Sequence, residues 1–504
     1  MTTILLVSVI IIATCGLVYE LIAGTAASYL LGDSVTQFST IIGCYLFSMG
    51  IGSWLTRYIN RNLLAAFIRV EILVGVIGGC SAVLLFVLFE YIDSFRILLY
   101  LLVSVIGILV GIEIPLLLRM LKDRFEFRDL VSRVLALDYV GALFASLLFP
   151  LLLVPYLGLV KSSFMFGVLN VSVAVWVLYA IRDDFPWVRL HRWSAVSAMV
   201  GLIFGFVYSE KLMSFAETSA YDGTIIYSRS SPYQRIVITK EAQDLRLYLN
   251  ANLQFSSIDE YRYHEALVHP ALAALPQLRQ VLVLGGGDGL AIREILKYPT
   301  VESITVVDLD PLMTDLFSSS PLLTSLNQSA LLSPKVTIIN RDAFVWLREQ
   351  ARLPQRRLYD AVLMDVPDPS NFSIGKLYTT TFFELLHHVT HDQSMITVQS
   401  TSPLFARKSF WCINKTIQAS GFMTTPYHTY VPSFGEWGFI IASRNRFQAA
   451  RQYPDGLRYI SVATVRQIFH FPADMAEVDT RVQRLDDQIL VHYFDDEWSD
   501  YLIY

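Results

Sequence analysis

Val281-Leu-Val-Leu-Gly-Gly-Gly-Asp-Gly-Leu-Ala-Ile-Arg-Glu294 is the stretch that decides the fold of the C-terminal half. Its first four residues are apolar, which is typical of a buried parallel strand. The glycines let the backbone turn tightly and approach a ligand. The run from Leu290 to Lys297 predicts a helix whose N-terminus points at that ligand. This order of strand, turn and helix predicts a Rossmann-like α/β domain.

An acidic residue follows the next strand at an informative distance. The apolar run Ile304–Val307 ends in Asp308, 20 residues after Asp288. In this architecture an acidic residue at about that spacing binds ribose hydroxyls, so we expect a nucleoside rather than a structural turn alone. The loop reads G-G-G-D-G instead of G-x-G-x-x-G. A carboxylate inside the loop would repel a pyrophosphate and suit a cationic ligand group.

Two further predicted strands also end in acidic residues. Val336–Ile339 leads to Asp342, and Asp360–Met364 leads to Asp365 and Asp368. Asp342 or Asp368 taken alone would be assigned to a helix cap or a turn. Open parallel sheets bind ligands at the carboxyl ends of their strands, so we expect the acids to converge on one edge. A cluster of this kind fits a positively charged substrate: Asp288, Asp308, Asp342, Asp365 and Asp368.

The first half reads as a membrane domain. The whole chain is 54% hydrophobic, and the apolar residues gather before residue 209. A spanning helix needs about 20 apolar residues, so six runs are long enough and a seventh, of 16 residues, is short. The runs are 3–31, 38–58, 63–90, 95–120, 131–155, 157–181 and 193–208.

Lys and Arg gather in alternate loops of this region. Loops 57–62, 119–133 and 182–192, the last including Arg182, hold two, five and three of them, whereas the opposite loops hold only Lys161. Basic loops face the cytoplasm. If the seventh run spans, the C-terminal half lies outside the cytoplasm; if not, it is cytoplasmic. We expect a multi-pass protein of the cell (inner) membrane and favour the cytoplasmic side for its C-terminal half, although sequence alone leaves the side open.

Five ionisable residues lie in or at the edges of the apolar runs. Charges in a membrane are costly and often functional. We favour pairing between helices, for example of Glu113 with an arginine of a neighbour, over a polar translocation path. The five are Glu20, Arg69, Glu71, Glu113 and Asp138.

Charge and cysteine content exclude other classes. A net charge of −5 argues against a nucleic-acid partner, which requires a basic surface. The four cysteines show neither CxxC nor metal-ligand spacing, so we expect no metal site and no disulfide framework.

The predicted organisation has four parts. Residues 1–208 form the transmembrane domain, with six or seven helices, and 220–275 form a small β subdomain whose strands precede a helix from Asp259 to Pro270. Residues 276–445 form the Rossmann-like domain. Residues 446–504 form a packing extension with helices expected at Val462–Phe469 and Ala476–Leu485.

The ordered motifs resemble the spermidine synthase (polyamine aminopropyltransferase) family. The whole chain is similar to the bacterial subgroup of that family with an N-terminal multi-pass membrane domain. The resemblance covers about residues 224–445. It rests on Gly285–Gly289, Asp308-Leu-Asp310, Arg341-Asp342, Asp365-Val-Pro-Asp368-Pro369, Tyr233-Gln234 and Asp259–Glu265.

The resemblance implies decarboxylated S-adenosylmethionine as aminopropyl donor, putrescine or a related amine as acceptor, and no further cofactor. Asp365 would be the catalytic residue. Gln234, His264 and Asp288 would contact the methionine-derived arm, Asp308 the ribose and Asp342 the adenine, with Gly285 and Gly287 in the loop. Tyr263 and Asp368 would line the acceptor side. Two departures fall on that side: Val366-Pro367 replaces two serines, and Phe434 replaces a tyrosine.

The chemistry agrees with this implication. An amine with a pKa near 10 is protonated at neutral pH, so a carboxylate must take its proton before it can attack carbon. The main expectation is therefore an aminopropyltransferase that makes spermidine and methylthioadenosine. The alternatives are an S-adenosylmethionine-dependent methyltransferase acting on a membrane substrate, and a polyamine transporter or sensor. Soluble relatives of this family form oligomers, which suggests a homo-oligomer.

Overall fold

The computed structural model describes residues 2–31, 34–89, 92, 94–122, 124–180, 188–217 and 221–501. The chain forms two compact units, Met1–Pro232 and Tyr233–Tyr504. The finer predicted boundaries, at residues 208, 220, 276 and 446, stay predictions.

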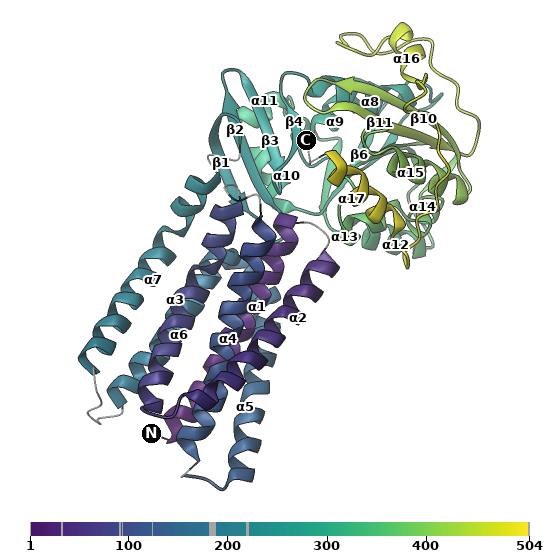
Figure 1. The fold of residues 1–504 in the computed structure, drawn as a ribbon. Coiled ribbons are helices and arrows are strands. Elements are labelled where there is room, and N and C mark those ends of the chain that lie inside the picture. The colour runs from purple at the N-terminus through teal and green to yellow at the C-terminus, as the bar shows by residue number, and fades with distance from the viewer. Residues whose placement is uncertain are drawn as a thin grey trace. The chain divides into compact units, whose positions relative to one another are not determined.

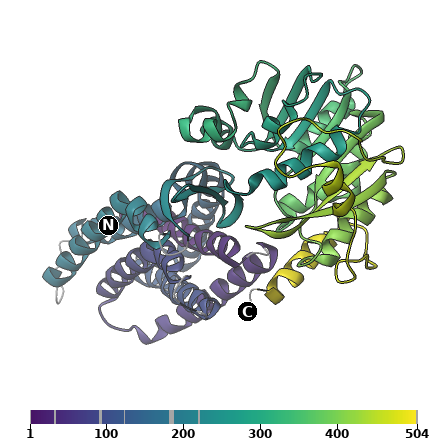
Figure 2. The ribbon, with the colours of Figure 1, turned by 90° about the horizontal axis from the view of Figure 1, so that it is seen from above.

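The described part of the first unit is a bundle of seven long α-helices, drawn from purple to teal in Figures 1 and 2. Its helices pack around one apolar core, and a strand, β1 (Thr224–Ser230), follows them. The helices are α1 (Thr2–Leu31), α2 (Ser34–Leu55), α3 (Leu63–Phe89), α4 (Phe95–Leu121), α5 (Phe127–Leu148), α6 (Gly158–Ala180) and α7 (Val188–Glu217).

Helices α5 and α6 belong to one long apolar segment, Phe127–Ala180, of 54 residues. A straight helix of that length would measure about 80 Å, far more than a bilayer core of about 30 Å. The π-helical turn η2 (Phe149–Leu157) and Gly158, whose φ is +73°, separate the two helices. Both α5 and α6 pack against α1, so the segment folds back on itself.

Helix α7 corrects one sequence-based expectation. The apolar run 193–208 has 16 residues and is expected either to span or to lie at the interface, but the helix covers Val188–Glu217, and its apolar part Val188–Leu212 has 25 residues. Charged residues near both ends of this helix shortened the apolar run in the sequence, because they interrupt hydropathy without ending a helix. They are Arg189 and Arg192 at one end and Glu210 and Lys211 at the other. Arg182, counted among the basic loop residues, lies outside the described residues.

Six apolar segments of the described residues are long enough to cross a membrane, counting Phe127–Ala180 once. Because α5 and α6 run in opposite directions within that segment, the described bundle consists of seven helices. An odd number of antiparallel helices places the start of α1 and the end of α7 at opposite ends of the bundle, as Figure 1 shows.

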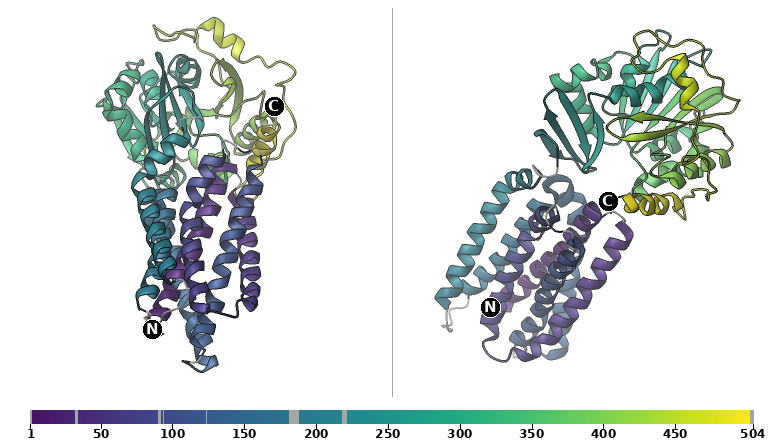
Figure 3. Two further views of the ribbon diagram at one scale, coloured as in Figure 1. Left: turned by 60° about the vertical axis from the view of Figure 1, so that its left-hand side comes forward. Right: turned by 45° about the horizontal axis from the view of Figure 1, so that its top comes forward.

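The second unit is built on a seven-stranded sheet with strand order β10-β11-β9-β8-β5-β6-β7. Strands β9, β8, β5, β6 and β7 are parallel to one another. At one edge, β11 runs antiparallel to both of its neighbours, β9 and β10. Helices cover both faces of the sheet (Figure 3). The strands are β5 (Gln280–Gly285), β6 (Ser303–Asp308), β7 (Val336–Asn340), β8 (Tyr359–Asp365), β9 (Thr390–Gln399), β10 (Met423–Val431) and β11 (Gly435–Ser443).

The predicted Rossmann-like architecture is therefore confirmed. Ahead of the large sheet, β2 (Arg235–Glu241), β3 (Asp244–Leu249) and β4 (Asn252–Ser256) form an antiparallel meander. Helix α8 (Glu260–Leu272) follows, close to its predicted span. The other helices are α9 (Leu290–Ile295), α10 (Pro311–Ser319), α11 (Pro321–Leu326), α12 (Ala343–Arg352), α13 (Phe372–Gly375), α14 (Thr380–Leu386), α15 (Arg407–Ala419), α16 (Val462–Ile468) and α17 (Ile489–Tyr501), with short turns η1 (Thr56–Tyr58), η3 (Ala330–Leu332) and η4 (Lys376–Tyr378).

The C-terminal segment confirms one predicted helix and corrects another. Helix α16 matches the expectation, whereas residues 476–485 form no helix. Their backbone carbonyls accept hydrogen bonds from side chains of α15 instead, so they are not free to bond within a helix. The pairs are Arg407 Nε with Ala476 O, Lys415 Nζ with Thr480 O, and Cys412 Sγ with Arg481 O.

A second tie fixes this segment to α8. The carboxylate of Glu265, which is buried, accepts hydrogen bonds from the backbone N–H groups of Arg458, Tyr459 and Ile460 at 2.8, 2.8 and 2.9 Å. Glu265 is the neighbour of His264 in the chain. The extension therefore holds the helix that carries a predicted site residue.

The contact between α2 and α4 depends on glycine. A Cβ added at Gly52 would lie 2.0 Å from the carbonyl oxygen of Ile108, whereas one added at Gly50 meets nothing within 4 Å. We expect Gly52→Ala to destabilise the bundle by about 1–3 kcal/mol, because overpacking forces the helices apart. Thermal unfolding of the purified full-length protein, followed by tryptophan fluorescence, measures this effect. Gly50→Ala is the matched control, and equal melting temperatures for the two variants would contradict the packing argument.

Candidate active site

The sheet topology gathers the predicted acids along one edge. Strand β5 lies between β8 and β6, and β7 pairs with β6. In this register Gly285 is opposite Asp365, and Asp308 is opposite Asn340. The carboxyl ends of four parallel strands therefore lie side by side, as the strand-end argument predicted.

The glycine loop depends on conformations that favour glycine. Gly285 and Gly286 have φ values of +83° and +67°. A Cβ on Gly285 would lie 2.0 Å from the carbonyl oxygen of Asp365, and the N–H of Gly286 donates to that oxygen at 3.2 Å. The N–H of Gly287 donates to Asp308 Oδ2 at 3.0 Å. The loop is thus fastened to both of the strand-end aspartates that flank it.

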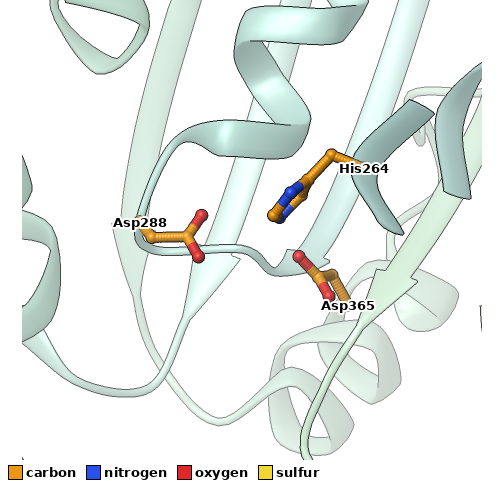
Figure 4. Close-up of side chains that lie close together, drawn as sticks. All are labelled: His264, Asp288 and Asp365. Atoms are coloured by element: carbon orange, nitrogen blue, oxygen red, sulfur yellow. The ribbon is translucent and has the colours of Figure 1, made fainter. Parts of the chain in front are cut away.

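Three of the predicted site residues form one cluster. One side-chain ligand atom from each of His264, Asp288 and Asp365 lies within 4.8 Å of the others, and Figure 4 shows the three side chains facing a common space. The hydroxyl of Tyr263 donates to Asp365 Oδ1 at 2.7 Å. Residues from α8, the glycine loop and the end of β8 therefore meet, as the sequence analysis expected.

A buried ionic network sets the charge of His264. Its Nδ1 lies 2.8 Å from Glu260 Oε2, and Arg293 pairs with the same carboxylate through both terminal nitrogens. Burial alone lowers the pKa of His264, but the hydrogen bond to Glu260 and the charges of Glu260, Asp288 and Asp365 raise that pKa to about 9. A protonated imidazole cannot bind a metal ion. The cluster is therefore suited to pairing charges at neutral pH.

As the pH decreases, the aspartates of the site lose their negative charge at a higher pH than ordinary aspartates do. Burial raises the pKa of Asp288, Asp308 and Asp368 to about 6 each. Burial also raises the pKa of Asp365, while His264 and the Tyr263 hydroxyl act in the opposite direction. Cationic ligands would stabilise the ionised forms, because an opposite charge lowers a carboxyl pKa.

Asp342 and Gln234 are placed near the edge but have other partners. Asp342 Oδ1 caps α12 by accepting from the N–H of Val345, which is the helix-cap role considered for it. Its Oδ2 pairs with Lys376 Nζ at 2.6 Å, and this cation lowers its pKa against the effect of burial. Gln234 donates to Asp310 Oδ2 at 3.0 Å. Neither residue belongs to the cluster around His264.

The predicted acceptor side contains Asp368 and aromatic rings. Asp368 accepts hydrogen bonds from Gln399 Nε2 at 2.8 Å and from the Thr401 hydroxyl at 3.2 Å. The ring of Tyr263 has its centroid 6.5 Å from those of Phe434 and Trp437. Phe434 thus stands beside Tyr263 without a hydroxyl of its own.

Sequence reasoning missed several residues that shape this site. Lys376 lies in the loop after Asp368, and a lone lysine in a loop gives no signal for its partner. Glu260 and Arg293 lie 33 residues apart, and only the packing of α8 on α9 brings them together. The others are Asp310, Tyr378, Gln399 and Thr401.

Apart from Gln234, the predicted residues of this site fall in a region that matches a known family model. The spermine/spermidine synthase domain matches residues 260–452. A crystal structure of a spermidine synthase from Thermotoga maritima resembles 49% of this chain and 85% of that one, with 22% identity and a TM-score of 0.45. The family assignment takes nothing from this structural likeness.

Curated relatives match the chain from end to end. A polyamine aminopropyltransferase of Leptospira interrogans is 52% identical over 499 residues, which is 99% of each chain. Polyamine aminopropyltransferase 2 of Ralstonia nicotianae is 51% identical over 507 residues, covering 99% of this chain and 98% of that one. The match includes the helical unit as well as the α/β unit. This chain therefore belongs to the polyamine aminopropyltransferase family of transferases.

Proposed function

We propose that this protein moves the aminopropyl group of decarboxylated S-adenosylmethionine to putrescine, giving spermidine and methylthioadenosine. The observation that carries the proposal is the meeting of Asp288 and Asp365 around one space beside His264. Both substrates are cations, since the donor carries a sulfonium and an amine and the acceptor carries two amines. Carboxylates in and beside the glycine loop suit these two cationic substrates.

Asp365 is the proposed catalytic base. Its carboxylate takes a proton from the acceptor ammonium, and the nitrogen lone pair then attacks the propyl carbon next to sulfur. The C–N bond forms as the C–S bond breaks, and the bonding pair returns to sulfur, which becomes a neutral thioether. No acid is needed for this leaving group. The Tyr263 hydroxyl holds Asp365 by its hydrogen bond of 2.7 Å, so the base is oriented before substrate binds.

The remaining predicted residues take supporting roles in this proposal. Asp288 pairs with the donor's free amine, which favours a donor that lacks the carboxylate of ordinary S-adenosylmethionine. Asp308 and the loop glycines Gly285 and Gly287 hold the ribose end. Gln234 and Asp342 exchange their present partners for donor atoms. Asp368, with the neighbouring aromatic rings, receives the amine acceptor.

Replacing the proposed base tests reaction class and residue together. We expect Asp365→Asn to reduce methylthioadenosine release about 10²–10⁴-fold, because a general base contributes about that factor. The measurement is product release by the purified full-length protein from decarboxylated donor with a series of diamines. Asp479→Asn, at an exposed aspartate paired with Lys415, is the matched control. Wild-type protein that released no thioadenosine with any diamine, or that bound the carboxylated donor more tightly, would reject the proposal in favour of a methyltransferase.

The pH dependence follows from the raised carboxyl pKa values. Asp288, Asp308 and Asp368 are protonated below about pH 6 in the empty protein and cannot attract cations there. We expect kcat/KM for the decarboxylated donor to be constant above that pH and to fall as the pH decreases through about 6. A limb steeper than tenfold per pH unit is expected, because more than one carboxylate must be ionised. A fall that began only near pH 4, the ordinary aspartate value, would show that burial does not control these groups.

We also propose that the first unit spans the cell membrane through its seven helices. The apolar part of α7, at 25 residues, would extend about 37 Å and so can cross a core of about 30 Å. The expectation of a cytoplasmic catalytic unit required the seventh apolar run to be too short to cross the membrane. With seven passes, the ends of α2, α4 and α6 and the starts of α3, α5 and α7 share one end of the bundle, and the chain leaves from the other. Arg57, Arg119 and Arg189 of the basic segments lie at the shared end. Basic loops face the cytoplasm, so this distribution favours a catalytic unit on the opposite side.

Reporter fusions test the side directly. We expect alkaline phosphatase fused after Tyr504 to be active and a green fluorescent protein fused there to be dark, since each reports one side of the bacterial inner membrane. Fusions at residue 60 provide the matched control and should give the reverse pattern. A fluorescent C-terminal fusion together with a fluorescent fusion at residue 60 would place both on the cytoplasmic side and would reject seven crossings.

A further inference from the structure

Two glutamates lie in the interior of the helical unit without their usual partners. Glu71 of α3 and Glu113 of α4 are each 0% exposed. Among the described residues, neither carboxylate oxygen of Glu113 has a hydrogen-bond partner, and neither does Oε1 of Glu71. The expected pairing of Glu113 with an arginine of a neighbouring helix is therefore wrong. Arg69 donates its Nε to His191 Nε2 at 2.9 Å instead.

The polar groups nearest to these glutamates are already engaged. Asn170 donates to Glu71 Oε2 at 2.9 Å, and its oxygen accepts from the Tyr19 hydroxyl at 3.4 Å. The Tyr45 hydroxyl donates to the carbonyl oxygen of Gly16 at 2.7 Å. These hydrogen bonds occupy the donor groups of Asn170, Tyr19 and Tyr45 but leave three of the four carboxylate oxygens without a hydrogen-bond partner.

The two carboxylates belong to one cluster. Glu113 interacts electrostatically with Glu71, and both interact with Tyr19 and Cys15 of α1. Helices α1, α3 and α4 pack against one another. Gly78 of α3 makes room for the Tyr19 ring, because a Cβ there would lie 2.7 Å from its Cζ atom. Two aromatic hydroxyl groups and two carboxylates are thus held at the centre of the bundle.

A pair of buried carboxylates needs positive charge. Two like charges in an apolar interior cannot both remain ionised without a counter-charge, so they bind a cation or take up protons. Buried acidic residues of membrane helices commonly mark paths for ions and substrates. A primary ammonium group offers three N–H donors, as the lysine side chain does. Three carboxylate oxygens lack a hydrogen-bond partner, which equals the number of N–H donors on the ammonium group. One proton on each glutamate would supply only two donors.

We propose that Glu71 and Glu113 form a binding site for an organic ammonium ion inside the helical unit, in addition to the site at Asp365. The buried groups Tyr19 and Tyr45 both interact electrostatically with Glu113 and so belong to the surroundings of this site. The class of ligand takes support from the proposed reaction, whose acceptor and product are both alkylamines. The site itself rests on the buried, unpartnered carboxylates alone.

Counting bound amine tests the proposal. The full-length protein is placed in lipid nanodiscs and dialysed to equilibrium against radiolabelled spermidine. We expect two bound amines per wild-type chain and one per Glu71→Gln/Glu113→Gln chain, with methylthioadenosine release unchanged in the double variant. Glu210→Gln is the matched control, because Glu210 is an exposed glutamate of α7 paired with Lys161, and it should retain two.

Two results would overturn the proposal. They are equal amine binding by wild type and the double variant, and proton uptake at these glutamates without any amine binding. If the double variant does not accumulate, the single variants replace it, and each should weaken the second amine at least about 30-fold, since breaking a buried charge pair costs 2 kcal/mol or more. Unchanged affinity in both single variants would also count against the site. Loss of methylthioadenosine release in the wild type would reject the proposed reaction but not this site.

Discussion

The close approach of Gly285 to Asp365 is the constraint on which the α/β unit depends. Strands β5 and β8 are neighbours in register, and the backbone of one ends against the backbone of the other with no space for a Cβ. The N–H of Gly286 then binds the Asp365 carbonyl, which fixes the loop in relation to the proposed base. Because the loop also carries Asp288, this contact sets the separation of the two carboxylates. The chemistry of the site therefore begins with a backbone contact, not with a side chain.

The two units bury acidic groups in different ways. In the α/β unit Glu260 is surrounded by His264 and Arg293, so its charge is compensated within the protein. Arg293 pairs with Glu260 and Glu294, whereas the imidazole of His264 also lies beside Asp288 and Asp365. In the helical unit no such compensation surrounds Glu113 among the described residues. Acidic groups without a basic partner among the described residues, such as Glu113 and Asp368, are thus found in both units, and such groups suit a family whose substrates are cations.

The sequence predicted the parts of the site that depend on local pattern. Strand ends, the glycine loop and the spacing from Asp288 to Asp308 each follow from periodicity and turn chemistry, and the structure confirms the edge on which they meet. Lys376, Glu260 and Arg293 could not be predicted, because their partners come from distant elements that only tertiary packing brings together. The full length of α7 was missed because charges at its ends reduce hydropathy. The helix expected at Ala476–Leu485 failed because α15 takes up the carbonyl groups that such a helix would need.

The hydrogen bonds of Glu265 have a consequence for the making of the protein. This buried carboxylate, next to His264 in α8, receives its three donors from residues 458–460, almost two hundred positions later in the chain. On the ribosome, α8 and the glycine loop emerge long before those donors exist. A nascent chain or a truncated product that ends before Arg458 would carry an uncompensated charge beside the site. A chain that ends before Arg458 therefore lacks the three donors that hold α8, and with it His264, in its place in the complete unit.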